Sequence, residues 1–110
     1  MLVLADHVHL AAILRTNPRG GVRISLGPAP NNGVVLRHPG VSKFHAWLEP
    51  IEEGSVQIVE PGSSNGTWVN DVRLQRRVHV EARSRDRIQF CSVKAVLWSL
   101  HALWVSQHGD

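Results

Sequence analysis

Two stretches of the sequence decide the fold: Gly40-Val41-Ser42-Lys43-Phe44-His45-Ala46-Trp47-Leu48 and Pro61-Gly62-Ser63-Ser64-Asn65-Gly66-Thr67-Trp68-Val69-Asn70. Each one is a polar turn that runs directly into a segment in which alternate residues differ in character. That alternation is typical of a strand with one buried face. The turns carry small polar residues, and loops held by a rigid scaffold are where binding residues usually lie.

Short strand-like segments fill most of the remaining chain. Around the two turns, the period-two alternation predicts strands that are separated by turn signals at intervals of roughly eight to twelve residues, as in sandwiches and barrels. The predicted strands are 22–26, 34–36, 44–48, 56–60, 67–69, 72–74, 78–80, 88–90 and 93–98. The sequence therefore predicts an all-β fold, with a sandwich and a barrel as alternatives.

At each end of the chain, the residue pattern leaves two alternatives for the secondary structure. Residues 3–14 read as one or two strands, and a short helix competes because leucine and alanine favour helices. Near the other end, Leu100, Leu103 and Trp104 have helical spacing. A short C-terminal helix and a strand that continues from Trp98 are the alternatives for residues 99–110.

Composition predicts a single domain over residues 1–110. No apolar run approaches the roughly 18 residues of a membrane span, and Met1-Leu2-Val3-Leu4-Ala5 is too short for a secretory signal. The single Cys91 suits a reducing compartment, so a cytoplasmic location is expected. Because Cys91 lies in a strand-like run, we expect a buried, unreactive thiol.

The charges are unevenly distributed although the net charge is only +3. A solvated basic face and a surface that attracts an acidic partner are both compatible with this asymmetry. Nucleic-acid binding is a weaker alternative, because aromatic residues are not interleaved with these arginines. The basic residues in question are Arg73, Arg76, Arg77, Arg83, Arg85 and Arg87.

Four short motifs follow one another in the chain: Gly27-Pro28, Ser42-Lys43-Phe44-His45, Gly62-Ser63-Ser64-Asn65-Gly66-Thr67 and Arg85-Asp86-Arg87-Ile88-Gln89-Phe90. Together they resemble the forkhead-associated (FHA) domain over residues 22–98. The resemblance implies a β-sandwich of two mainly antiparallel sheets, the FHA/SMAD-like architecture. It also implies a protein-interaction module that binds phosphothreonine peptides in Ser/Thr kinase signalling.

The resemblance also implies a role for individual residues. Ser42 and Lys43 would contact the phosphate, Ser64 would add a donor, and Asn65 would hold the main chain of the peptide. Arg37 is a further candidate, because the family's phosphate-binding arginine falls on Pro28 in this sequence. The residues expected to support the loops are Gly27, His45, Gly66 and Asn70.

The replacement of arginine by Pro28 leaves two hypotheses open. One is a phosphothreonine-dependent module, and the other is a module of the same fold that binds a protein or self-associates without phosphate. The resemblance implies a protein or peptide partner, no membrane and no cofactor.

Catalysis and metal binding have weaker support in the sequence. Gly62-Ser63-Ser64-Asn65-Gly66 matches a nucleophile elbow, but a strand-like segment follows where that motif needs a helix. His7 and His9 could share a strand face, yet no cysteine or carboxylate cluster completes a metal site. We therefore expect no enzyme activity and no metal.

Overall fold

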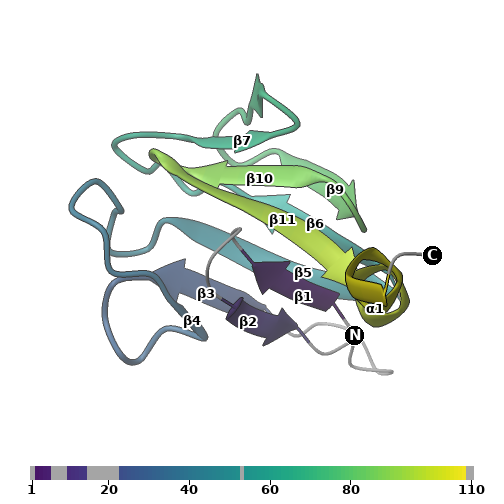
Figure 1. Ribbon diagram of the computed structural model, residues 1–110. Coiled ribbons are helices and arrows are strands. Elements are labelled where there is room, and N and C mark those ends of the chain that lie inside the picture. The colour runs from purple at the N-terminus through teal and green to yellow at the C-terminus, as the bar shows by residue number, and fades with distance from the viewer. Residues whose placement is uncertain (1, 6–9, 15–22, 53, 109–110) are drawn as a thin grey trace.

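The computed structural model describes residues 2–5, 10–14, 23–52 and 54–108. These residues form two layers of strands that pack face to face (Figure 1). The β-sandwich implied by the resemblance is therefore confirmed, and the barrel alternative is wrong.

The first sheet has six strands, all paired antiparallel, in the order β2-β1-β11-β10-β7-β8. The strands that the chain contributes last, β10 and β11, lie at its centre, and the first strand pairs with the last one. The bounds are β1 (Leu2–Ala5), β2 (Leu10–Leu14), β7 (Thr67–Val69), β8 (Val72–Arg73), β10 (Arg87–Phe90) and β11 (Val93–Ser99).

The second sheet has five strands in the order β4-β3-β5-β6-β9. Its pairs are antiparallel except for the short parallel pair between β3 and β4. The bounds are β3 (Ile24–Gly27), β4 (Val34–Val35), β5 (Ala46–Glu52), β6 (Ser55–Val59) and β9 (His79–Arg83).

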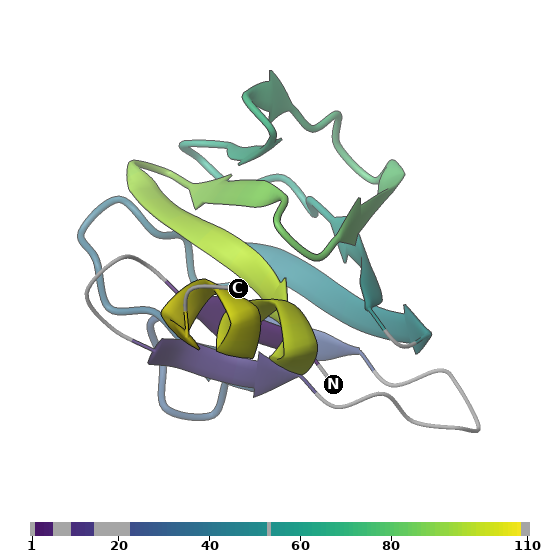
Figure 2. The ribbon, with the colours of Figure 1, turned by 45° about the vertical axis from the view of Figure 1, so that its right-hand side comes forward.

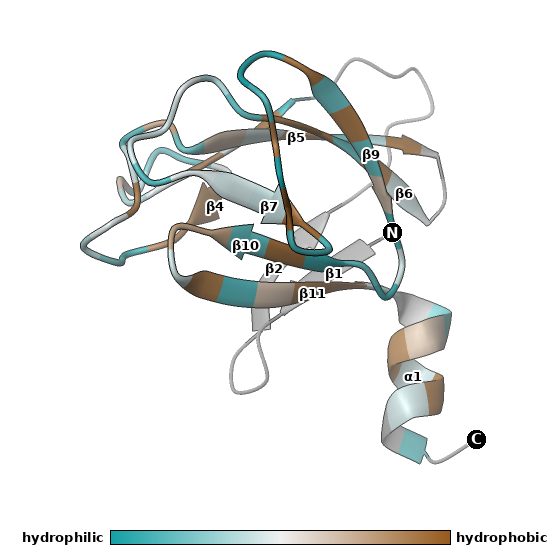
Figure 3. Cartoon of the chain, turned by 90° about the horizontal axis from the view of Figure 1, so that it is seen from above, coloured by the Kyte–Doolittle hydropathy of each residue, from teal (hydrophilic) through white to brown (hydrophobic). Residues whose placement is uncertain are grey.

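The core lies between the sheets and is built from alternate residues of the strands. On β10, Ile88 and Phe90 are buried whereas Arg87 is exposed, and hydrophobic and hydrophilic bands alternate along β9 and β10 (Figure 3). Leu26 and Leu48 are fully or almost fully buried on the facing sheet. Burial of such side chains stabilises the fold by about 25 cal/mol per Å² of apolar surface.

The chain ends in a helix, α1 (Leu100–His108), which directly follows β11. Figure 2 shows α1 in front, at the end of the sandwich that lies on the right in Figure 1. The Ser99 hydroxyl accepts a hydrogen bond from the Ala102 N–H, as an N-terminal cap does. Of the two alternatives for this segment, the helix is therefore correct.

Near the N-terminus, residues 2–14 contain two strands, so the helix alternative is wrong there. β1 pairs antiparallel with both β2 and β11. These pairings override the helix propensity of leucine and alanine. His7 and His9 lie outside the described residues.

The strand predicted over 44–48 has the wrong bounds, and the one predicted over 78–80 continues as β9 to Arg83. The alternation from Phe44 to Leu48 suggested a strand there, with a turn over 50–54, but β5 begins at Ala46 and continues to Glu52. Phe44 lies in the preceding turn and is 46% exposed. Pro50 is tolerated inside β5 because the pairing with β6 shifts register between Pro50 and Glu52, and bulges accept proline.

The expectation of a buried thiol at Cys91 is also wrong. Cys91 is half-buried and lies in the tight turn between β10 and β11, with φ of +58°. Its side chain packs against the edge of the core and also lies beside the loops: a β-carbon built on Gly40 would lie 2.2 Å from the Cys91 Sγ.

Candidate functional site

The two turns that dominate the sequence lie at the same end of the sandwich. The chain enters β5 and leaves β6 at this end, which lies on the left in Figure 1, away from α1. The loops there are mostly hydrophilic in Figure 3. We refer to residues 40–45 as the serine loop and to residues 60–66 as the asparagine loop.

Two hydrogen bonds join the serine loop to the asparagine loop. The Ser64 backbone N–H donates to the Ser42 hydroxyl oxygen over 2.9 Å, and the Asn65 side-chain amide donates to the Gly40 carbonyl over 2.8 Å. Ser64 and Asn65 are exposed, and Ser42 is half-buried. The Ser42 O–H and one Asn65 N–H stay available as donors, together with the Asn65 Oδ1 as an acceptor.

His45 joins the same two loops from beneath and is fully buried. Its Nδ1 accepts a hydrogen bond from the Ser42 N–H over 3.0 Å, so its Nε2 carries the proton and donates to the Gly66 carbonyl over 2.8 Å. The ring also packs edge-on against Phe90. His45 therefore fixes the backbone of Ser42 relative to that of Gly66.

Gly27 is the last residue of β3 and lets this strand approach the serine loop closely. The His45 N–H donates to the Leu26 carbonyl over 2.8 Å, and a β-carbon built on Gly27 would lie only 2.1 Å from the Lys43 carbonyl oxygen. Any residue with a β-carbon would push the Lys43 backbone away. The glycine is needed for space at this position.

Gly66 is needed for its conformation. Its φ is +87°, which residues with a β-carbon rarely adopt. In this conformation its carbonyl accepts hydrogen bonds from both the His45 Nε2 and the Cys91 N–H.

Glu60 organises the asparagine loop, and the sequence interpretation missed it. Its carboxylate, which is almost fully buried, accepts hydrogen bonds from the N–H groups of Gly62 (2.5 Å) and Ser63 (2.9 Å) and from the Ser63 hydroxyl. The Ser63 hydroxyl oxygen in turn accepts the Gly66 N–H over 3.1 Å. An acidic residue followed by Pro-Gly-Ser is the signal that could have identified it, because carboxylates commonly cap such turns.

The positive charge near the serine loop is exposed. Lys43 lies in the loop with its ammonium 5.8 Å from the centre of the Phe44 ring. Arg37 is exposed and makes no hydrogen bond or ion pair to any described residue. Pro28 is half-buried and follows Gly27 directly, and its ring leaves no backbone N–H to donate.

Asn70 lies at the far end of β7 from Gly66 and supports another turn. Its Nδ2 donates to the Asp86 carboxylate over 3.0 Å, and its Oδ1 accepts the Arg87 N–H over 2.8 Å. Its φ of +48° lies in the left-handed region, which asparagine tolerates better than most residues.

Replacing this asparagine should affect stability and leave ligand binding unchanged. For Asn70→Ala, we expect the free energy of unfolding to fall by about 1–2 kcal/mol, since two hydrogen bonds are lost and alanine is strained at positive φ. Urea denaturation measures the change. Asn70→Gly removes the same bonds without the strain and should lose less; equal stability of Asn70→Ala and the unchanged protein would contradict this role.

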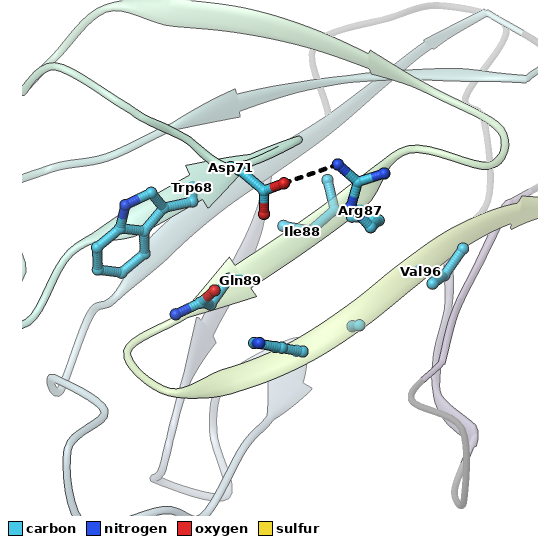
Figure 4. Close-up of a pocket in the computed structure, with 8 residues that line it drawn as sticks. Trp68, Asp71, Arg87, Ile88, Gln89 and Val96 are labelled. Carbon is cyan, nitrogen blue, oxygen red and sulfur yellow. Dashed lines mark hydrogen bonds and ion pairs between the residues drawn. The ribbon is translucent and has the colours of Figure 1, made fainter.

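A hollow on the sheet surface lies away from these loops. A cavity of about 230 Å³ lies over β7, β10 and β11, lined by residues that include Trp68, Gln89 and Val96, and an ion pair of 2.8 Å between Asp71 and Arg87 crosses one side of it (Figure 4). None of the predicted site residues lines it. In the parts of the chain that the structure describes, no group of three potential metal ligands occurs, and no helix is both long and apolar enough to cross a membrane.

Comparison with known proteins identifies relatives of this chain. The model of the FHA domain matches residues 24–91. The FHA domain-containing protein PS1 of Arabidopsis thaliana is 34% identical over 65 residues, which cover 58% of this chain and 4% of that protein. A protein phosphatase 1 regulatory inhibitor subunit PPP1R8 homolog of the same plant is 34% identical over 58 residues, which cover 53% of this chain and 16% of that protein.

Solved structures share the fold at low identity. The FhaA FHA domain, solved in complex with the intracellular domain of Rv3910, superposes with a TM-score of 0.72 at 19% identity, covering 88% of this chain and 99% of that one. The N-terminal FHA domain of Rad53p from S. cerevisiae, solved with a phosphothreonine peptide, gives 0.71 at 14% identity, covering 93% and 95%. With the family model matching most of the sandwich, the chain belongs to the FHA domain family.

Proposed function

We propose that the protein is an interaction module whose serine and asparagine loops bind a phosphothreonine peptide. The observation that carries this proposal is the direct linkage of the two loops, in which the Ser42 hydroxyl and the Asn65 amide lie in one hydrogen-bonded unit. Rad53p, a structural relative, was solved with such a peptide.

The chemistry of the loops suits a phosphate on an extended chain. A phosphate at neutral pH carries about −1.5 to −2 charges and three strong acceptor oxygens. The Ser42 O–H can donate to it, and the exposed Lys43 supplies a positive charge. The Asn65 side chain has a remaining donor and an acceptor, which match the carbonyl and N–H groups of a peptide main chain.

Pro28 sets the strength of binding that we expect. Relative to an FHA domain with arginine at this position, the loss of one charge-assisted hydrogen bond of about 1.5–3 kcal/mol weakens affinity roughly ten- to a hundredfold. Arg37 has no partner among the described residues and is the candidate replacement. The module then depends on phosphate but binds it weakly.

We further propose that the module is not an enzyme and acts in the cytoplasm. The Ser42 hydroxyl accepts a hydrogen bond from the Ser64 N–H, and both ring nitrogens of His45 bond backbone groups. The Ser42 hydroxyl and the His45 ring therefore do not form a nucleophile–base pair. The free Cys91 suits a reducing compartment. The partner is a Thr-phosphorylated protein, for which this module provides the docking surface.

The proposal is tested with an oriented peptide library that has phosphothreonine fixed at its centre. Selected peptides are then titrated by calorimetry in phosphorylated and unphosphorylated form, and we expect the phosphorylated form to bind at least about tenfold more tightly. Ser42→Ala should weaken the affinity for the phosphorylated peptide about tenfold, because a donor to the phosphate is lost. Its stability should change by less than about 1 kcal/mol, since the Ser42 backbone stays bonded to His45.

Ser92→Ala is the matched control, because Ser92 is an exposed serine in the neighbouring turn between β10 and β11. It should bind like the unchanged protein. Equal affinity for the phosphorylated and unphosphorylated peptides would refute the proposal and favour the phosphate-independent module instead. An unchanged affinity in Ser42→Ala would remove the serine loop from the phosphate site.

A further inference from the structure

A polar cavity of about 310 Å³ adjoins the asparagine loop and is separate from the Ser42 side of the site. The loop contributes its wall through Glu60, Gly62 and Ser63, and the chain that follows β7 contributes Arg73, Leu74 and Arg76. Both arginines therefore lie against the loop that carries Asn65, although they come from a different part of the sequence.

Arg73 is held beside Gly66 and Trp68. A β-carbon built on Gly66 would lie 3.0 Å from the Arg73 Nε, and the guanidinium lies 5.3 Å from the centre of the Trp68 ring. Trp68 and Arg73 are directly opposite each other on β7 and β8, so the strand pairing sets this position. A guanidinium that stacks on an aromatic ring keeps its N–H edge free for an anion.

Arg76 is held beside Gly62 in the same way. A β-carbon on Gly62 would lie 2.7 Å from the Arg76 Nε, which donates to the Pro61 carbonyl over 3.2 Å. This bond anchors the guanidinium and uses one of its five N–H groups. The terminal groups of Arg76 make no hydrogen bond to any described residue.

Neither of these two arginines, which line the cavity, has a carboxylate partner in the described parts of the chain. Arg83 pairs with Glu81 over 3.2 Å, and Arg87 pairs with Asp71 over 2.8 Å (Figure 4). Among the described residues, no carboxylate lies within 4 Å of the guanidinium nitrogens of Arg73 or Arg76. Glu60 also lines the cavity, but its carboxylate is occupied by Gly62 and Ser63. The cavity therefore carries an excess of positive charge.

We infer that Arg73 and Arg76 form a second anion subsite, which selects a ligand with a negatively charged side chain near its phosphothreonine. This inference rests on the proposed function. A peptide whose main chain is held at Asn65 advances about 3.3 Å per residue, so a side chain a few residues away reaches the other side of the same loop. The shared chemistry is an oxygen anion, carried by aspartate, glutamate or a second phosphorylated residue.

The test uses the fixed-phosphothreonine library with the full chain and with Arg73→Gln, Arg76→Gln and the double variant. For the unchanged protein, we expect enrichment of an acidic residue at one flanking position, by about fivefold for a carboxylate and more for phosphoserine. Separate arms with aspartate and phosphoserine at that position distinguish the two sources. The double variant should lose the preference and bind peptides with neutral flanks as tightly as before.

Arg77→Gln is the matched control, since Arg77 is exposed, follows Arg76 directly and does not line the cavity. It removes the same charge and should keep the preference. Thermal unfolding verifies that each variant is folded, and the single variants serve if the double variant is not. Loss of the preference in Arg77→Gln would overturn the inference, as would its retention in the double variant.

The same data separate this inference from the proposed function. If phosphothreonine peptides bind the unchanged protein without any acidic preference, only the second subsite is wrong. If no phosphothreonine peptide binds, the proposed function fails, and the second subsite fails with it.

Discussion

Replacement of His45 by alanine should lower the free energy of unfolding by about 3–4 kcal/mol, which is a large part of the stability of a small domain. The side chain is fully buried, and it bonds the Ser42 N–H and the Gly66 carbonyl on separate loops. Alanine leaves both backbone groups without a partner and leaves a cavity beside Phe90. Urea denaturation followed by tryptophan fluorescence measures the loss.

Phosphopeptide affinity should fall in the same variant, because the Ser42 backbone is no longer fixed relative to the asparagine loop. His45→Phe separates the two causes of instability. Phenylalanine keeps an aromatic ring against Phe90 but cannot bond either backbone group, so it should recover only part of the lost stability. A loss below about 1 kcal/mol in His45→Ala would show that the loops hold together without this bridge.

Gly27→Ala should be the second most damaging single change. Its added methyl group would lie 2.1 Å from the Lys43 carbonyl oxygen, which belongs to the backbone and cannot rotate away. We expect the free energy of unfolding to fall by about 2–3 kcal/mol, as for other overpacked sites. Because the serine loop must shift, affinity for a phosphothreonine peptide should fall roughly tenfold or more, measured by calorimetry.

Gly54→Ala is the control for this glycine. Gly54 adopts φ of +88° in the turn between β5 and β6, at the other end of the sandwich, and a β-carbon there would meet nothing within 4 Å. Alanine should therefore cost about 1 kcal/mol through backbone strain and leave the affinity unchanged. Unchanged affinity in Gly27→Ala would mean that the exact position of Lys43 is unimportant for binding.

The parts of the site that could be predicted from sequence are those with local signals. The bracing role of His45 was implied by the family resemblance, and it is a local one: His45 lies three residues after Ser42, and its side chain bonds the Ser42 backbone. Period-two alternation identified the strands around them, because a strand with one buried face leaves that pattern. The link between Ser42 and Asn65 came only from the family resemblance, since their separation along the chain carries no physical signal.

The remaining parts depend on tertiary contacts. Arg73 reaches Gly66 only because β8 pairs with β7, and a cluster of arginines in the sequence does not show which of them lack partners. Phe44 continues the alternation of β5 but lies outside the strand, where turn geometry overrides the pattern. Cys91 lies in a strand-like run, yet the turn gives it a left-handed backbone that residue type did not predict.

The hydrogen bonds between the serine loop and the asparagine loop also determine where the entropy cost of binding falls. Because Ser64, Asn65 and His45 already fix these loops before any ligand arrives, little further ordering of the protein is required on association. The penalty is then borne mainly by the flexible peptide. Making the phosphopeptide rigid, for example by cyclisation, should therefore raise the affinity more than making the protein more rigid would.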